Sequence, residues 1–271
     1  MVRAKRSLSQ NFLVDKNIRR KLIETLDPAP DDGVVEVGPG HGELSELLVG
    51  RVRRLVLIEK DDRLAPLLAE RWSDRPEVVV VHGDALEVDI SEFAAGSRVR
   101  FVSNVPYAIT SPLIFRLLDA QPAPVRIVVL VQQEVARRIT AEPGGKEYGA
   151  LSVGVQTRAR TWLAFRVGRQ AFRPVPGVDS AAVVMEPRPG KTRAQIEAVR
   201  TLTRAAFSRR RKQLGTILRT APEFALGPDQ LTTVTRALGI DPAVRPEDIT
   251  PESFEALAVR LQSLRSERHR G

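Results

Sequence analysis

The chain alternates between two spacings of apolar residues. Residues 16–26 carry Ile18, Leu22, Ile23 and Leu26 at helical spacing, which predicts an amphipathic helix. Beyond it, short apolar runs alternate with segments of helical spacing. We expect strands at 34–37, 55–58, 78–81, 98–102 and 127–131, and helices at 43–49, 64–72, 111–118 and 133–140. This order predicts an α/β fold with a doubly wound, mainly parallel sheet.

The pattern changes after Gly149. Three apolar runs, at 151–155, 162–167 and 181–185, follow one another without helical spacing between them, so we expect an antiparallel edge on the sheet. Pro and Gly at 187–190 are typical of a linker. Helical spacing then dominates, at 192–207, 209–218, 227–238 and 251–265. We therefore expect a sheet domain at 1–189 and a small C-terminal helical domain at 190–271.

Composition narrows the classes of function. The 271 residues include 42 Lys and Arg against 33 Asp and Glu, a formal charge of +9, which favours a polyanionic partner such as nucleic acid. There is no cysteine and the three histidines are scattered, so we expect no disulfide, no thiol nucleophile and no metal site. No apolar run approaches the ~18 residues of a membrane helix, and no signal peptide is evident. We expect a cytoplasmic protein.

A glycine turn follows the first predicted strand. Residues 34–42 read Val-Val-Glu-Val-Gly-Pro-Gly-His-Gly, and glycines let the backbone approach a ligand closely. A dinucleotide fingerprint requires glycine at position 43, where this chain has glutamate. The turn fits S-adenosylmethionine (SAM) better, since that cofactor has no pyrophosphate. Its elements are a leading Glu36 and the glycines Gly38, Gly40 and Gly42.

Acidic residues follow the next two strands. Glu59 ends one strand and can accept both hydroxyls of a ribose. Asp84 follows the next strand and can accept an adenine amino group, while the Ala85 N–H meets a ring nitrogen. A single carboxylate is more often a solvated loop charge, but such groups after successive strands favour an adenosyl cofactor. NAD would satisfy Glu59 equally well, so a dinucleotide oxidoreductase stays an alternative.

The segment Asn104-Val105-Pro106-Tyr107 follows another buried apolar run. An aminopurine becomes nucleophilic when acceptors hold both N–H groups and a flat surface holds the ring. Asn104 Oδ1 and the Val105 carbonyl can be these acceptors. Pro106 fixes the backbone, and Tyr107 can stack on the base. The same residue types are also common in turns at strand ends.

Several segments together resemble one family. They lie at 10–15 (Gln-Asn-Phe-Leu-Val-Asp), 36–40, 59, 83–85, 104–107, 148–153 (Tyr-Gly-Ala-Leu-Ser-Val), 172–181 and 207–212. With these motifs the chain resembles, over nearly its whole length, the KsgA-type ribosomal RNA adenine dimethyltransferases. That family also includes the erythromycin-resistance methyltransferases.

The resemblance implies a Rossmann-like SAM-dependent methyltransferase fold, with the target adenine between Tyr107 and Phe172. It implies that the methyl donor is held by Asn11, Leu13, Gly38, Glu59, Asp84 and Asn104. In the housekeeping branch, two adjacent adenosines near the 3′ end of small-subunit (16S) rRNA are dimethylated at N6 during ribosome biogenesis. The implied partner is ribosomal RNA or the immature small subunit. The motifs at 172–181 and 207–212 favour this branch, and we expect a monomer.

Some features keep alternatives open. Ser9 stands where the housekeeping branch has Gly, which is closer to the resistance branch and its large-subunit target. Val105 replaces the usual Leu but preserves the backbone carbonyl. An aromatic such as Phe172 is more often a core residue than a stacking platform. A ribosome-assembly factor in which binding matters more than methylation is a further alternative.

A cationic segment opens the predicted helical domain. It consists of Arg209, Arg210, Arg211 and Lys212, with no acidic residue within four positions on either side. We interpret it as a contact to RNA phosphates. The alternative is a solvated helix face, in which case the basic residues at 3–6 are the next candidate surface.

Overall fold

The computed structural model describes residues 10–93 and 98–268, so Ser9 and the basic residues at 3–6 lie outside the described residues. The chain divides into two compact units. The first unit consists of Met1–Ala136 and Ala159–Arg188, and the second of Arg137–Arg158 and Pro189–Gly271.

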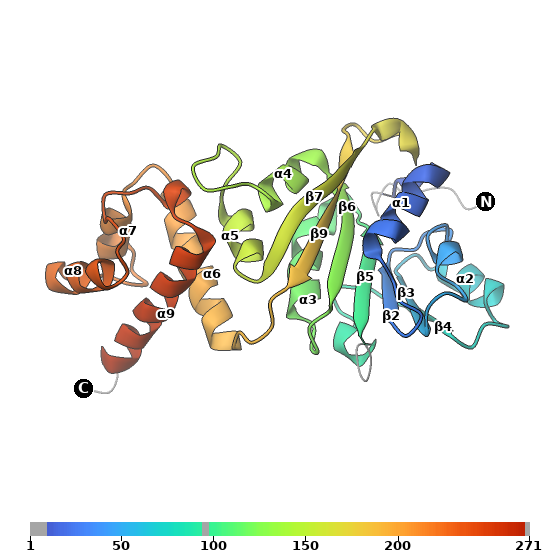
Figure 1. Cartoon of the computed structure of the whole chain (residues 1–271), viewed down its shortest axis with the longest axis horizontal. Coiled ribbons are helices and arrows are strands. Elements are labelled where there is room, and N and C mark those ends of the chain that lie inside the picture. The colour runs from blue at the N-terminus through green and yellow to red at the C-terminus, as the bar shows by residue number, and fades with distance from the viewer. Residues whose placement is uncertain (1–9, 94–97, 269–271) are drawn as a thin grey trace. The chain divides into compact units, whose positions relative to one another are not determined.

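The first unit is built on a seven-stranded sheet (Figure 1). Its strands are β2 (Gly33–Val37), β3 (Arg54–Glu59), β4 (Val78–His82), β5 (Val99–Asn104), β6 (Arg126–Gln132), β7 (Ala159–Val167) and β9 (Ser180–Pro187). They lie in the order β4-β3-β2-β5-β6-β9-β7. The first five are parallel, and β9 pairs antiparallel with both β6 and β7. The prediction of a mainly parallel sheet with an antiparallel edge is confirmed.

Helices cover the sheet because its strands are buried on both faces. They are α1 (Lys16–Leu26), α2 (Ala65–Arg71), α3 (Thr110–Asp119) and the start of α4 (Gln133–Ile139), with short 3-10 turns at η2 (Ser45–Leu47), η3 (Ile90–Phe93), η4 (Tyr107–Ile109) and η5 (Arg169–Ala171). Asp15 caps α1 by accepting the N–H groups of Asn17 and Ile18. The apolar face of α1 packs into the main core with side chains from alternate strand positions, while α3 lies behind the strands in Figure 1.

Two local differences from the sequence prediction concern the first unit. The helix expected at 43–49 is only the 3-10 turn η2, and the chain turns away at Gly50, whose φ is +72°. A short antiparallel pair, β1 (Phe12–Leu13) with β8 (Phe172–Arg173), was not predicted. Strands of two residues are too short to produce a periodic signal.

The second unit is helical. It contains α5 (Ala150–Gln156), α6 (Arg193–Phe207), α7 (Leu214–Thr220), α8 (Pro228–Ala237), η6 (Pro246–Asp248) and α9 (Pro251–Arg268). Its core joins buried side chains of these helices to the fully buried Tyr148. The Tyr148 hydroxyl donates to the Ile249 carbonyl at 2.8 Å, so the segment before α5 is fastened to the one before α9.

The strand expected at 151–155 is wrong, because these residues form the helix α5. Tertiary contacts override their β-branched composition. Ser152 Oγ accepts the Gly149 N–H at 3.0 Å, and Gln156 Nε2 donates to the carbonyls of Ile139 and Ala141. Residues 137–158 therefore belong to the helical unit, whereas the sequence pattern predicts one domain over all of 1–189. The helix expected at 209–218 begins only at Leu214.

Candidate active site

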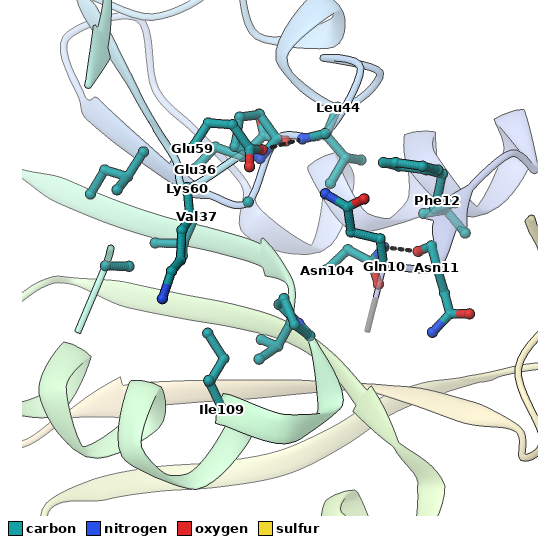
Figure 2. Close-up of a pocket in the computed structure, with 18 of the residues that line it drawn as sticks. Gln10, Asn11, Phe12, Glu36, Val37, Leu44, Glu59, Lys60, Asn104 and Ile109 are labelled. Carbon is teal, nitrogen blue, oxygen red and sulfur yellow. Dashed lines mark hydrogen bonds between the residues drawn. The ribbon is translucent and has the colours of Figure 1, made fainter. Parts of the chain in front are cut away.

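The pocket lies at the carboxyl ends of parallel strands. Strands β2, β3, β4 and β5 end at Val37, Glu59, His82 and Asn104, and these ends meet at one edge of the sheet, where ligands bind in open α/β folds. One pocket there is lined by all the predicted cofactor residues and by the segment 104–107 (Figure 2). These residues are Asn11, Leu13, Gly38, Gly40, Glu59, Asp84, Ala85, Asn104, Val105, Pro106 and Tyr107.

The glycine turn needs its glycines. Gly38 and Gly40 have φ values of +69° and +62°, in the region that side chains other than glycine avoid. A Cβ added at Gly40 would lie 2.9 Å from the Phe12 ring. Glycine at this position therefore lets the turn approach the segment that carries Asn11. Gly38 and Gly40 both line the pocket, so the backbone of the turn is accessible to a ligand.

Glu59 is prepared to accept hydrogen bonds. It is 4% exposed. Its Oε2 accepts the Gly40 N–H at 3.0 Å and its Oε1 accepts the Asp61 N–H at 2.8 Å. Burial raises the pKa of Glu59, and these two backbone bonds oppose the rise. Each carboxylate oxygen has a second lone pair, so the fixed carboxylate can also accept ribose hydroxyls.

Asp84 is held by Lys60, a residue that no sequence motif marks as part of the site. Lys60 Nζ pairs with Asp84 Oδ2 at 2.5 Å, and Asp84 Oδ1 accepts the Leu86 N–H at 2.9 Å. The lysine lowers the pKa of Asp84, so the carboxylate stays ionised and can accept hydrogen bonds. A lysine after a strand-ending acid resembles a solvated charge in sequence, and only its position at the pocket reveals the pairing.

Glu36 lies deeper in the same pocket. It is 2% exposed and accepts a hydrogen bond from Ser45 Oγ at 2.6 Å. Burial raises the pKa of Glu36 to about 8, with nearby Glu43 and Glu59 adding to the rise. A cationic ligand placed here would favour the ionised carboxylate. The acidic groups of the pocket therefore suit a cofactor with a positively charged sulfonium.

The amide of Asn104 has a defined orientation. Its Nδ2 donates to the backbone carbonyl of Asn11 at 2.8 Å (Figure 2). Because a carbonyl can only accept, the nitrogen must face Asn11. Oδ1 accepts no hydrogen bond from the described residues and is left for a ligand. The neighbouring backbone is fixed as well, since Val105 N–H donates to the Leu130 carbonyl at 3.1 Å.

Tyr107 is half-buried at the pocket. Its hydroxyl lies 2.9 Å from Ser180 Oγ, within hydrogen-bonding distance. Burial raises the pKa of Tyr107, so the phenol is neutral at physiological pH. Its backbone lies in η4, where Thr110 Oγ1 donates to the Tyr107 carbonyl at 3.2 Å. An aromatic ring held in this way can form a surface for a base.

Phe172 is not among the residues that line the pocket, and a base-stacking wall at this position stays a prediction. Its side chain is 1% exposed and belongs to the main core cluster. The cause is the unpredicted β1–β8 pair, in which Phe172 is the register partner of Leu13.

The cationic segment belongs to the helical unit and follows α6. Arg210 Nε pairs with Glu247 Oε2 at 2.5 Å, and Arg210 Nη2 donates to the Lys146 carbonyl at 3.1 Å. Arg209 is half-buried, and its Nη1 is buried without a hydrogen-bond partner among the described residues. Arg211 and Lys212 are exposed.

Metal-binding clusters and membrane-spanning helices are not found in the described part of the chain. Across residues 10–93 and 98–268, no three His, Cys, Asp or Glu side chains are grouped so as to hold a metal ion. None of the helices described there is long and apolar enough to cross a membrane.

A doubly wound sheet with an antiparallel edge, a glycine turn and acceptors for an adenosyl group defines a SAM-dependent methyltransferase. The model of the family described as "Ribosomal RNA adenine dimethylase" matches residues 1–262. The chain belongs to this family, whose members use SAM as the methyl donor.

Relatives and solved structures agree with this assignment. The chain is 38% identical to Ribosomal RNA small subunit methyltransferase A of Geobacter metallireducens, covering 97% of each chain. It is 41% identical to the protein of the same name from Chlorobium phaeobacteroides, over 79% of this chain and 78% of that one. A dimethyladenosine transferase from Plasmodium falciparum is 25% identical with a TM-score of 0.78, covering 91% and 95%. The 23S rRNA methyltransferase ErmE is 29% identical with a TM-score of 0.71, covering 93% and 99%.

Proposed function

We propose that this protein transfers methyl groups from SAM to N6 of two adjacent adenosines near the 3′ end of small-subunit rRNA. Its substrate is the immature small ribosomal subunit, on which it acts as a monomer in the cytoplasm. The relatives of highest identity named above carry the small-subunit name, and this supports the small subunit over the large one. The first unit carries the chemistry, and the helical unit contributes to RNA binding.

The observation that carries the proposal is the orientation of Asn104. With Nδ2 committed to Asn11, Oδ1 accepts one N–H of the target amine and the Val105 carbonyl accepts the other. These bonds hold the nitrogen lone pair out of conjugation with the ring. Tyr107 supplies the flat surface on which the base stacks.

SAM supplies a methyl group already activated on a sulfonium, so the chain needs no strong base. Glu59, Asp84 and Ala85 hold the adenosyl part, and the Gly38 turn lets the remainder approach the backbone. Positioning is then the main source of rate. The amine loses its proton after transfer, when it has become an acidic ammonium. After the first methylation only one N–H remains, so one acceptor suffices in the second round.

Arg211 and Lys212 are the cations we assign to RNA phosphates. Both are exposed, whereas Arg210 is committed to Glu247 and Lys146. The expected role of Arg210 is to hold the segment in shape.

Mass spectrometry of rRNA, after incubation with labelled SAM and immature small subunits, tests the proposal. We expect two adjacent dimethyladenosines in small-subunit rRNA. Label found only in large-subunit rRNA would favour the resistance chemistry and contradict the proposal. A catalytically inactive variant that fully supports subunit maturation would instead favour an assembly factor.

A further inference from the structure

Ser180 contacts Tyr107, the proposed base-stacking residue, and has no role in the proposed function. It is the first residue of β9 and is fully buried. Its Oγ lies 2.9 Å from the hydroxyl of Tyr107, a residue 73 positions away in sequence. Ser180 belongs to the motif at 172–181, and its partner Tyr107 lines the pocket.

Ser180 is a rigid anchor. It pairs with Gln132 of β6 and with Val167 of β7, so strands flank it on both sides. The preceding residue, Asp179, accepts the Gln133 N–H through its carbonyl at 3.0 Å, and its side chain accepts the Arg169 N–H at 3.0 Å. The hydroxyl of Ser180 therefore has little freedom to follow a moving partner.

The Tyr107 ring is held at both ends. At its backbone, the η4 turn is closed by the Ile109 N–H, which donates to the Pro106 carbonyl at 3.0 Å. At the far end, the phenol meets Ser180. A tyrosine has two rotatable side-chain torsions, and immobilising a side chain at an interface costs about 0.5–1.5 kcal/mol. If the ring is already fixed before the base binds, this free energy is not lost during binding or reaction.

We propose that Ser180 is a positioning residue for methyl transfer, which fixes the direction of the Tyr107 side chain so that the target adenine stacks with its amine beside Asn104. The proposal rests on the proposed function, since it assumes that Tyr107 receives the base. Ser180 touches neither substrate nor cofactor and acts only through Tyr107.

Three variants test the anchor: Ser180→Ala, Tyr107→Phe and the double variant, assayed by steady-state methylation of immature small subunits. Each removes the same hydrogen bond, so we expect each to lower kcat by about 2- to 12-fold, the rate equivalent of the ordering cost. The double variant should be no slower than either single variant, because the two residues act through one contact. KM for the subunit should not change, since phosphate contacts dominate RNA affinity.

Stability measurements separate positioning from a merely structural role. Tyr107→Phe leaves the buried Ser180 hydroxyl unpaired and should destabilise the fold, whereas the double variant removes both partners and should recover stability. The rate should stay low in both. As a matched control, Thr157→Val removes a buried hydroxyl that donates to the Val153 carbonyl in the helical unit, and it should leave kcat unchanged. Ser180→Thr retains the hydroxyl and should retain the rate.

Additive losses in the double variant, or wild-type kcat in Ser180→Ala and Tyr107→Phe, would overturn the proposal. Tyr107→Ala in the same assay shows whether only the anchor role of Ser180 is wrong or also the stacking role of Tyr107. If Tyr107→Ala is slow while the other variants are normal, only the anchor is wrong. If Tyr107→Ala is as fast as the wild type, the stacking role of Tyr107 is wrong and the anchor fails with it.

Discussion

The pocket and the cationic segment present polar groups to their ligands in opposite ways. Glu59 and Asn104 are tied to backbone groups of distant segments, at 3.0 Å from Gly40 N and 2.8 Å from the Asn11 carbonyl. Arg211 and Lys212 in the helical unit are exposed on a turn between two helices. The first arrangement fixes the direction in which each lone pair points. The second supplies positive charge with little constraint on direction.

The difference follows from what each ligand demands. Methyl transfer depends on angles and distances at one atom, so its groups must be set before the ligand arrives. RNA phosphates are recognised by charge, and this binding is insensitive to the exact position of each side chain. Substitutions in the pocket should therefore cause large effects that depend on geometry, and substitutions in the cationic segment should cause graded effects that depend on salt.

The largest effect should come from Asn104→Ala. It removes the acceptor for the target amine, and the loss of one preset group at a reacting centre typically costs about 10²- to 10³-fold in rate. Single-turnover methylation of immature subunits measures this loss. Binding of the subunit should be nearly unchanged, while some loss of SAM affinity is expected.

Asn104→Asp sharpens the argument about orientation. It keeps an acceptor at the same position but loses the nitrogen that donates to Asn11, and its charge is repelled by the Asn11 carbonyl. We expect a loss comparable with that of Asn104→Ala. If the aspartate variant reacts at the wild-type rate, the hydrogen bond to Asn11 does not set the geometry.

Glu59→Ala should have the next largest effect. The variant leaves ribose hydroxyls unpaired, which should weaken SAM binding by about 1–3 kcal/mol. Calorimetric titration measures this affinity. In a thermal-shift assay SAM and S-adenosylhomocysteine should stabilise the wild type, and NAD should not. Glu70→Ala is a matched control, since Glu70 is exposed on α2. Unchanged affinity in Glu59→Ala would remove this residue from the site.

The sequence predicts the pocket better than it predicts the surroundings of the pocket. Strand-ending positions such as Glu59 and Asn104 follow from apolar runs, and the parallel order of the strands brings their ends together. These positions are determined by local pattern and by one topological rule. The sequence also predicts an antiparallel edge on the sheet. It does not predict that β9 lies between β6 and β7.

What the sequence does not predict depends on contacts between distant segments. Phe172 is buried because a two-residue strand pairs with β1, and no periodicity marks so short an element. The helix at Ala150–Gln156 forms against the helical unit although its residues favour strands. Lys60 and Ser180 acquire their roles from partners 24 and 73 residues away.

A smaller, graded effect should come from the cationic segment. The double variant Arg211→Ala with Lys212→Ala removes two cations, so the salt dependence of subunit binding should flatten by about 0.7–0.9 for each phosphate that is no longer neutralised. Filter binding at several salt concentrations measures this slope. SAM binding should not change.

Arg210→Ala tests the division of roles inside the segment. Because Arg210 is paired with Glu247, its removal should lower the stability of the helical unit more than it changes the salt slope. If the Arg211 and Lys212 variant keeps the wild-type slope, these residues are only a solvated surface. The basic residues at 3–6 would then be the next candidates for the RNA surface.

The last expected effect concerns folding and not ligand binding: burial in the pocket should make the free energy of unfolding depend on pH. Glu36 ionises near its ordinary pKa of 4.5 in the unfolded chain, but burial raises its pKa to about 8 in the folded protein. Between these values the folded state keeps a proton that the unfolded state has lost, so the free energy of unfolding falls as pH rises, by at most about 1.4 kcal/mol per pH unit. Above the folded pKa this contribution is constant. Urea denaturation from pH 5 to 9 should therefore show a shallower decline for Glu36→Gln than for the wild type. Parallel curves for the two proteins would mean that Glu36 is already ionised in the folded pocket, and that the pocket is better solvated than its geometry indicates.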